Sequence, residues 1–235
     1  MEISALLSAL HLAEKLKDTT RHCDTSGGRR ESVADHSWRL ALMAYWISDE
    51  FPQADMNKVI KMCLIHDLGE CFTGDIPVFR KTPADEDREE ALLFAWVDAL
   101  PGPLGAEMRA LYAEMAARET LEARIYKALD GMEAVLQHNE SDIRSWEPHE
   151  YELNLTYAAD RTDFSPYLTR LRQAIREETE AKIQKAEWKQ RPPSRHAKEG
   201  AQPVKEALLQ RGNRASSRKR EGKAEKASTC GWRVS

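Results

Sequence analysis

A short stretch in the first third of the chain concentrates side chains that can carry out metal or acid–base chemistry. Residues 64–75 have the sequence LIHDLGECFTGD and include His66, Asp67, Glu70 and Asp75. If the helix that begins upstream continues to about Glu70, then His66 and Glu70 share one helical face, because they are four residues apart. Imidazole nitrogens and carboxylate oxygens are good ligands for divalent Mn, Fe, Co or Zn. The stretch therefore indicates part of a metal site.

Two ligands hold a metal ion poorly, so further ligands are expected elsewhere in the chain. His36 lies in ESVADHS, and Asp130 lies in YKALDGMEAV beside an apolar helical stripe. A bare carboxylate is costly to bury there without a cation or a hydrogen-bond partner. Each residue alone also fits a structural role, His36 as a hydrogen-bonded core residue and Asp130 as an ion-pair partner of Lys127. The ordered set of His36, His66-Asp67 and Asp130 favours the metal site.

The elements that must position these side chains are predicted to be helices. Apolar residues recur with helical spacing as far as about residue 188, and strand-like alternation is almost absent. Ser32 and Asp35 have the spacing of a capping box, Asp55 is a further N-cap candidate, and Gly74 should take the chain out of helical geometry. We predict an all-α body. Its helices are expected at about 6–17, 33–50, 56–70, 83–100, 104–118, 120–139 and 166–188, with a loop around the Gly27-Gly28 pair.

Charge divides the chain into two parts. Residues 1–188 hold 22 basic and 35 acidic side chains, whereas residues 189–235 hold 13 and 4. The second part is rich in Arg, Lys, Ser and Gly and poor in aromatic residues, so it cannot bury enough apolar surface to order itself. We predict one domain over 1–188 and a disordered basic tail over 189–235. Such tails more often solubilise or localise a protein than read a specific nucleic acid, so no nucleic-acid partner is expected.

Cysteine usage and hydropathy bear on the location of the protein. The four cysteines show no CxxC spacing, and Cys63 and Cys71 lie in segments predicted to be buried, so a disulfide framework is not expected. The N-terminus lacks the basic start of a signal peptide, and no apolar run approaches the roughly 18 residues that cross a bilayer. The sequence predicts a cytoplasmic protein without membrane contact.

The same residues resemble a known family. HDxxE running into TGD, preceded by RESVADHS, is similar to the HD-domain phosphohydrolases, and more narrowly to the 5′-deoxynucleotidase branch of YfbR-like and HD-domain-containing protein 2-like enzymes. The resemblance covers about residues 5–185. It implies an HD-domain helical bundle, a homodimer, and one divalent metal ion held by four ligands. Those ligands would be His36, His66, Asp67 and Asp130.

The resemblance also implies roles for other residues. Glu70 and Asp75 would be the two site carboxylates, and Arg21, fifteen residues before His36, would be a functional arginine. We expect Glu70 to orient or deprotonate water, Arg21 to hold two phosphate oxygens, and Asp75 to face the sugar or the leaving oxygen. In the bacterial enzymes a Trp that favours deoxyribose follows this Arg, but His22 stands here. Selectivity between ribose and deoxyribose is therefore left open.

The function that this resemblance implies is removal of the 5′-phosphate from (deoxy)nucleoside 5′-monophosphates by a metal-dependent phosphohydrolase. Two alternatives remain: another HD-type phosphohydrolase acting on a guanosine tetraphosphate or a cyclic nucleotide, and a non-catalytic nucleotide-binding module. Trp38, Tyr45 and Trp46 are expected in the core or in a dimer contact rather than stacked on a base. His138 follows Asp130 by eight residues, so it lies either near the site or, as we expect, at a solvent-facing helix end.

Overall fold

Helices account for almost all the regular structure of this chain, as the periodicity predicts. The computed structural model describes residues 1–190, so the predicted basic tail lies outside the described residues apart from its first two positions. None of the described helices is both long and apolar enough to span a lipid bilayer. The elements are α1 (Ile3–Glu14), β1 (Thr20–Asp24), β2 (Arg30–Ser32), α2 (Val33–Trp46), α3 (Met56–Ile65), α4 (Glu70–Thr73), α5 (Pro83–Asp98), α6 (Pro103–Ala117), α7 (Leu121–Glu140), α8 (Glu150–Thr156) and α9 (Pro166–Gln190), with short 3-10 turns η1 (Lys15–Lys17), η2 (Ser48–Glu50), η3 (Ile143–Ser145) and η4 (Ala159–Arg161).

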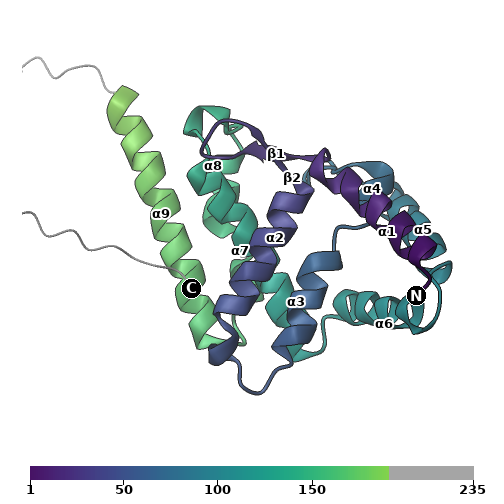
Figure 1. Cartoon of the computed structure of the whole chain (residues 1–235). Helices are drawn as coiled ribbons and strands as arrows, with labels where there is room; N and C mark the ends of the chain where they lie inside the picture. Colours follow the sequence, from purple (N-terminus) through teal and green to yellow (C-terminus); the bar gives the residue numbers. More distant parts are fainter. Residues whose placement is uncertain (191–235) are drawn as a thin grey trace, which may run out of the picture. The chain divides into compact units, whose positions relative to one another are not determined.

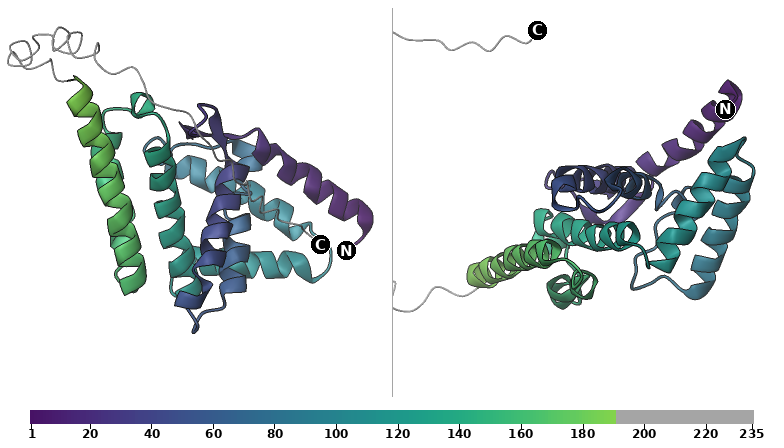
Figure 2. Two further views of the ribbon diagram at one scale, coloured as in Figure 1. Left: turned by 60° about the vertical axis from the view of Figure 1, so that its left-hand side comes forward. Right: turned by 90° about the horizontal axis from the view of Figure 1, so that it is seen from below.

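Three helices form the centre of the molecule. α2, α3 and α7 lie side by side, with α9 along one side of them and α5 and α6 on the other (Figures 1 and 2). Leu40, Met62 and Leu129, one from each central helix, are fully buried and belong to one continuous apolar cluster. The all-α fold class is confirmed. Because the central helices carry the predicted ligands, the core also fixes the spacing of the site.

Several helix starts are where the sequence predicts them. The Ser32 hydroxyl accepts a hydrogen bond from the backbone of Asp35, whose carboxylate accepts one from the backbone of Ser32, so the capping box at the start of α2 is confirmed. Asp55 caps α3 by accepting from the backbone N–H of Lys58. Gly74 has φ +77°, a left-handed value that ends α4. Local sequence therefore sets these boundaries.

The predicted third helix is interrupted at the HD pair, which is a correction. α3 ends at Ile65, and the backbone N–H of Glu70 bonds to the carbonyl of Asp67 at 3.0 Å, in a tight i to i+3 turn before α4. His66 and Glu70 therefore do not share one continuous helix. Gly69 leaves room for α5 to approach this turn, because a Cβ there would lie 2.8 Å from the Cγ of Glu89. Leu64 is 50% exposed, since α3 turns its neighbours Met62 and Cys63 inward.

A β-hairpin replaces the loop that the sequence predicts before α2. β1 and β2 pair antiparallel, with Thr20 opposite Ser32 and Asp24 opposite Arg30. The strands have five and three residues and are mostly polar, so alternation was too short to reveal them. The seven-residue helix α8 escaped prediction for the same reason. Both elements contribute to the candidate site.

Gly131 on α7 allows a close approach by the turn after α8. A Cβ at this position would lie 2.4 Å from the Cβ of Ala158 and 3.0 Å from Nη1 of Arg161. Ala158 itself adopts a left-handed φ of 61°. The turn thus packs against α7 directly beside Asp130, and only a glycine leaves room for it.

We predict that Gly131→Ala lowers stability although alanine is the better helix former. Helix propensity alone would stabilise the variant by about 1 kcal/mol, but a clash in a packed interface costs about 1–3 kcal/mol. Urea unfolding followed by circular dichroism measures the balance. Gly27→Ala, in the open hairpin turn, is the matched control and should stay near wild type. A Gly131 variant more stable than wild type would contradict the packing described.

Candidate active site

Two imidazoles face each other at the centre of the site. The Nε2 atoms of His36, on α2, and His66, at the end of α3, are 3.1 Å apart. Nδ1 of His36 contacts a carboxylate oxygen of Glu133, and Nδ1 of His66 lies 2.9 Å from the carbonyl oxygen of Cys63. These acceptors place the ring proton on Nδ1 in both residues, so the Nε2 lone pairs point toward each other. Such an arrangement needs a proton or a cation between the two rings.

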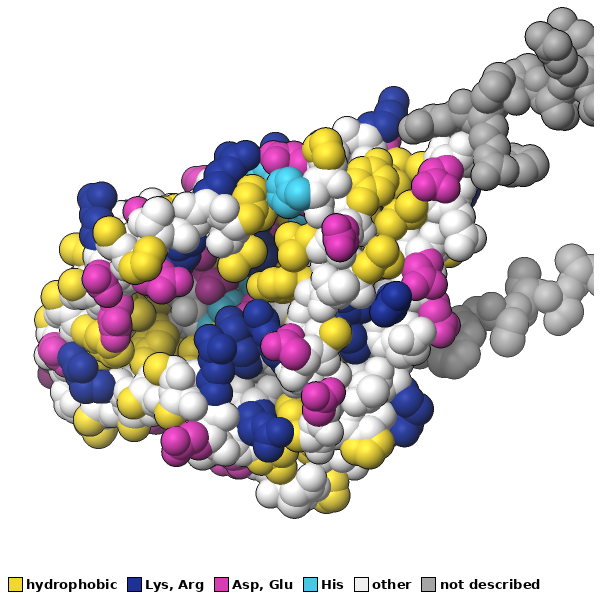
Figure 3. Space-filling model, turned by 180° about the vertical axis from the view of Figure 1, so that it is seen from behind, with side chains coloured by type: hydrophobic (Ala, Val, Ile, Leu, Met, Phe, Trp, Pro, Cys, Tyr) yellow, Lys and Arg dark blue, Asp and Glu magenta, His cyan; other side chains and the backbone are white. Residues whose placement is uncertain are grey.

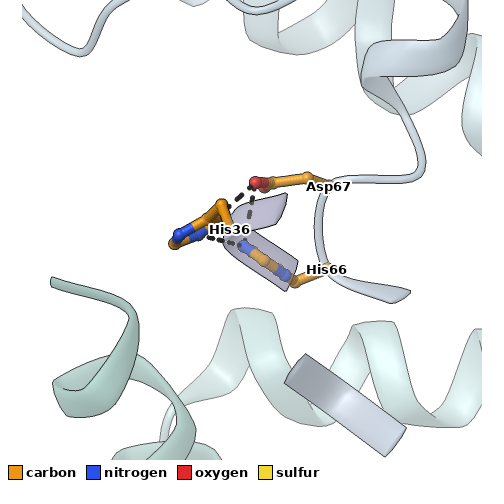
Figure 4. A group of neighbouring side chains, drawn as sticks. All are labelled: His36, His66 and Asp67. Atoms are coloured by element: carbon orange, nitrogen blue, oxygen red, sulfur yellow. Dashed lines mark hydrogen bonds and ion pairs between the residues drawn. The ribbon is translucent and has the colours of Figure 1, made fainter. Parts of the chain in front are cut away.

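Two carboxylates complete the group. Oδ2 of Asp67 lies 2.9 Å from His66 Nε2 and 3.8 Å from His36 Nε2 (Figure 4). Oδ1 of Asp130, on α7, lies 3.3 Å from His36 Nε2 and 3.7 Å from His66 Nε2. Ligand atoms around a cation at about 2.1 Å are roughly 3.0–3.4 Å apart. The ligand atoms of His36, His66 and Asp67 all lie within 4.8 Å of one another, as a shared metal ion requires. Asp130 borders the same two imidazoles, so the structure brings the four predicted ligands together.

Asp130 uses both of its oxygens. Oδ2 accepts from the Lys127 ammonium at 2.7 Å, while Oδ1 faces the histidines. Burial acts to raise the pKa of the Asp130 carboxyl, but Lys127 and the two imidazoles hold it well below its ordinary range. The ion pair that the sequence allowed as an alternative is thus present. It orients the proposed ligand.

Glu133 contacts His36 at Nδ1, the ring nitrogen that faces away from the proposed metal site. It was not among the residues predicted from the sequence. Its carboxylate is fully buried, contacts His36 Nδ1, and accepts from Arg39 Nε at 2.6 Å. Burial would raise its pKa, but His36, Arg21 and Arg39 lower it to about 2, so the group is ionised. A carboxylate in this position fixes the ring orientation and increases the basicity of Nε2. Its position three residues after Asp130, on the same face of α7, was the available signal.

A pocket of about 350 Å³ opens beside the four ligands. Asp67 and Asp130 line it together with Arg21, Glu70 and Asp75, so every remaining predicted site residue borders the same space. The face seen in Figure 3 is hollowed, and histidine and acidic side chains lie in the hollow beside gathered Lys and Arg side chains. The pocket therefore joins the metal-ligand group to cationic and acidic side chains.

Glu70 is a carboxyl of the pocket whose pKa departs strongly from its ordinary value. It is 7% exposed, and its Oε2 has no hydrogen-bond partner among residues 1–190. Burial, followed by the negative charges of Asp67 and Asp75, raises its pKa to about 10. The pKa of Asp75 is also raised by burial, although Arg21 offsets part of this. A cation among the ligands would reduce the repulsion that keeps Glu70 protonated.

Arg21 reaches the pocket from the hairpin. Its Nε lies 3.3 Å from Oε2 of the buried Glu31, which also accepts from the Cys23 thiol at 3.1 Å. Arg21 and Glu31 lie on neighbouring strands, so the hairpin pairs them. No local sequence pattern identifies Glu31, because its role depends on a strand pairing that was not predicted. It positions the predicted arginine.

The structure places His138 and three aromatic residues of α2 differently from what the sequence predicts. His138 lines the pocket, with Nε2 3.0 Å from Oε1 of the buried Glu150, so its placement at a solvent-facing end was wrong. Trp38, Tyr45 and Trp46 are 64%, 64% and 71% exposed and line no part of this pocket. Of the two placements expected for them, the core is therefore wrong, whereas the dimer contact stays a prediction. Their faces on α2 point outward because Leu40 and Ala44 occupy the buried side.

Known proteins are similar to this chain. The family model of the HD domain matches residues 13–172, more than half of the chain. The human protein 5′-deoxynucleotidase HDDC2 is 32% identical over 148 residues, which cover 61% of this chain and 72% of the human protein. The bovine protein of the same name is 36% identical over 112 residues, which are 47% of this chain and 54% of the relative. This chain therefore spans about half the length of the bovine relative.

A solved structure agrees over a larger share of the chain. The crystal structure of a predicted metal-dependent phosphohydrolase from Magnetospirillum magnetotacticum has a TM-score of 0.65 and 30% sequence identity. The match covers 77% of this chain and 93% of that protein. The similarity thus extends over the helical body.

We predict that Glu133→Gln weakens metal binding by about 10- to 100-fold, because the amide removes the charge that orients His36. Titration with Mn or Zn, followed by calorimetry, measures the change. Glu140→Gln is the matched control, since Glu140 also binds Arg39, at 2.6 Å, but makes no contact with His36 and is exposed. Equal metal affinity in the Glu133 variant and wild type would contradict this supporting role.

Proposed function

The chain belongs to the HD domain family, and from this premise we propose that it is a metal-dependent phosphohydrolase that removes the 5′-phosphate from nucleoside 5′-monophosphates. The observation that carries the proposal is the convergence of His36, His66, Asp67 and Asp130 beside a pocket. The human relative is named a 5′-deoxynucleotidase, which supports the nucleotide substrate. The similarity to a metal-dependent phosphohydrolase supports the reaction class.

The proposed ligands suit one divalent ion, with Mn, Co, Fe and Zn all compatible with two imidazoles and two carboxylates. A cation held there would offset negative charge on the phosphoryl group and lower the pKa of a nearby water molecule. Cys63 and Glu133 hold the ring protons away from the site, so the Nε2 lone pairs of His66 and His36 stay available. A metal ion held by these residues would bind a phosphate oxygen at this end of the pocket.

In the proposed reaction, water adds to phosphorus and the bond to the 5′ oxygen breaks, giving a nucleoside and inorganic phosphate. Glu70 accepts the proton of the water at Oε2, the atom without another partner. A raised pKa makes this carboxylate a strong base whenever it is ionised. Arg21 holds phosphate oxygens with its guanidinium, which Glu31 orients. Asp75, which follows the helix-ending Gly74, faces the sugar or the leaving oxygen.

We further propose a homodimer in a reducing cytoplasm. Trp38 and Tyr45 are seven residues apart on the outer side of α2, and a second copy would cover their exposed rings. The three cysteines of the described residues, Cys23, Cys63 and Cys71, are free thiols, which supports a reducing compartment. Purified protein that sediments as a monomer at tens of micromolar would contradict the dimer.

The catalytic domain is proposed to be residues 1–188, with 189–235 as a separate basic segment. Every residue given a role in catalysis lies between positions 21 and 130. The segment is therefore not needed for the reaction. The residues of the site do not indicate a binding partner for this basic segment.

We predict that Asp67→Ala and Glu70→Ala both lose phosphate release, by at least about 10²-fold, whereas only Asp67→Ala weakens metal binding. The reason is that Asp67 is a ligand and Glu70 acts on water. A panel of nucleoside and deoxynucleoside 5′-monophosphates, each with Mn, Co, Zn or Mg, provides the assay. Turnover that survives in the Asp67 variant would remove the metal-site proposal. Wild-type protein that binds nucleotides without releasing phosphate would favour the non-catalytic module.

We predict that Arg21→Lys raises KM roughly tenfold, because a lysine keeps the charge but cannot make two parallel hydrogen bonds to phosphate. Steady-state kinetics with a deoxynucleoside monophosphate measures KM and kcat. Arg29→Lys is the control from the same hairpin, since Arg29 is exposed and pairs with Asp35 outside the pocket. An unchanged KM in the Arg21 variant would mean that this arginine is structural.

A further inference from the structure

Unpaired polar atoms gather in the proposed pocket. Within residues 1–190, the buried side-chain nitrogen and oxygen atoms without a hydrogen-bond partner are His22 Nε2, Ser37 Oγ, Arg39 Nη2, Glu70 Oε2, Asn154 Nδ2 and Arg161 Nη1. Four of these six belong to residues that line this one pocket, although His22 Nε2 lies 3.2 Å from Glu147 Oε1, so Glu70, Asn154 and Arg161 are the three without such a contact. Buried polar atoms usually have partners, so their concentration in one place indicates where ligand atoms bind. Asn154 and Arg161 have no role in the reaction described above.

These two residues lie on one short segment that is held firmly in place. Asn154 is on α8 and is 4% exposed, and Arg161 is the last residue of η4. The buried Arg172 of α9 donates from Nη2 to the carbonyl of Asn154 at 3.0 Å and from Nε to the carbonyl of Tyr157 at 2.8 Å. The backbone is thus fixed at two points. Side chains on such a segment are preorganised for a ligand.

Arg161 is a free cation beside the metal ligands. Its Nη1 lies against Gly131, the residue that follows Asp130, and its guanidinium packs over the Tyr157 ring at 4.9 Å. Among the described residues, Arg161 forms no ion pair, whereas Arg21 pairs with Glu31. A half-buried guanidinium without a counter-charge is costly. An anionic ligand in the pocket would supply that charge.

Asn154 lies on the same wall of the pocket, which is formed by the segment from α8 to η4. The wall begins at Glu150, whose carboxylate is bonded to His138, and ends where Ala158 meets Gly131. His138 is seven residues beyond Gly131, which is about 10 Å along α7. Asn154 falls between these two ends. A phosphate beside Asp130 would therefore place the sugar of a nucleotide, rather than its phosphate, next to the Asn154 amide.

We propose that the α8–η4 segment is a substrate-binding wall in which Arg161 binds phosphate oxygens and Asn154 donates a hydrogen bond from Nδ2 to an oxygen of the sugar. The inference rests on the proposed nucleotide substrate. The guanidinium suits phosphate because its planar fork matches two oxygens. The neutral amide suits an uncharged acceptor, since it adds no charge to the part of the pocket that holds the sugar.

Calorimetry with two probes tests whether Arg161 binds the phosphate and Asn154 binds the sugar. Full-length protein loaded with Mn is titrated with inorganic phosphate and with a deoxynucleoside 5′-monophosphate, in a Glu70→Gln background that prevents turnover. Arg161→Gln should weaken both probes by about 10- to 100-fold, because it removes a charge-assisted contact to phosphate. Asn154→Ala should weaken the nucleotide by about 2- to 10-fold and leave inorganic phosphate unchanged.

Arg170→Gln is the matched control. Arg170 also lies near a tyrosine ring, that of Tyr167 at 5.9 Å, but it is exposed and lines no part of the pocket, so both affinities should stay at the wild-type value. If Arg161→Gln does not fold, Arg161→Lys keeps the charge without the fork and should still weaken phosphate.

Two results would overturn the proposal. One is phosphate affinity at the wild-type level in every folded Arg161 variant, and the other is equal loss of both probes in Asn154→Ala. Phosphate release by wild-type protein is measured separately. A protein that hydrolyses no nucleotide but still shows these binding differences would refute the proposed function and leave the binding wall standing.

Discussion

The site depends on two imidazole nitrogens held 3.1 Å apart with their lone pairs facing each other. Because Cys63 and Glu133 hold the protons on the opposite ring nitrogens, the pair is stable only with a positive charge between them. Glu133 and Asp130 raise the pKa of His36 to about 9 against the opposing effects of burial and Arg21, so a proton occupies this place when no metal does. A metal ion must displace that proton. The packing of α2, α3 and α7 is what keeps the two rings from separating.

The interruption of the helix after Ile65 follows from the same requirement. Adjacent residues of an α-helix point about 100° apart, so His66 and Asp67 could not easily converge on one point within a regular helix. The tight turn that begins at His66 allows Asp67 Oδ2 to approach His66 Nε2 at 2.9 Å. It also starts α4 at Glu70, which directs that carboxyl into the pocket. The helix is therefore interrupted at the residues whose side chains must approach one another.

The residues that could carry the chemistry of the site were more predictable from the sequence than the residues that hold them in place. Ligand types, helix caps and the positive-φ glycine at position 74 are local signals, and each appeared in the sequence within a few residues. Glu133 acts on His36 across 97 positions, and Glu31 acts on Arg21 through a hairpin too short to recognise. Asn154 lies on a helix of seven residues. These roles arise only when distant segments meet, so no local pattern could assign them.

The charges of the pocket explain how an acidic body can accept an anion. Residues 1–188 hold 35 acidic and 22 basic side chains, and Asp67, Glu70 and Asp75 border the pocket itself, so phosphate would be repelled without local compensation. Lys127 already neutralises Asp130, and Arg21 is paired with Glu31. Lys127 therefore mainly holds Asp130 in place, whereas Glu31 orients Arg21 for the phosphate oxygens that we propose it binds. A cation held by the ligand group, together with guanidinium groups that line the pocket, such as Arg21 and Arg161, would then supply positive charge to the substrate. Selectivity for an anionic group would thus come from a few positive charges placed in the pocket rather than from the net charge of the domain.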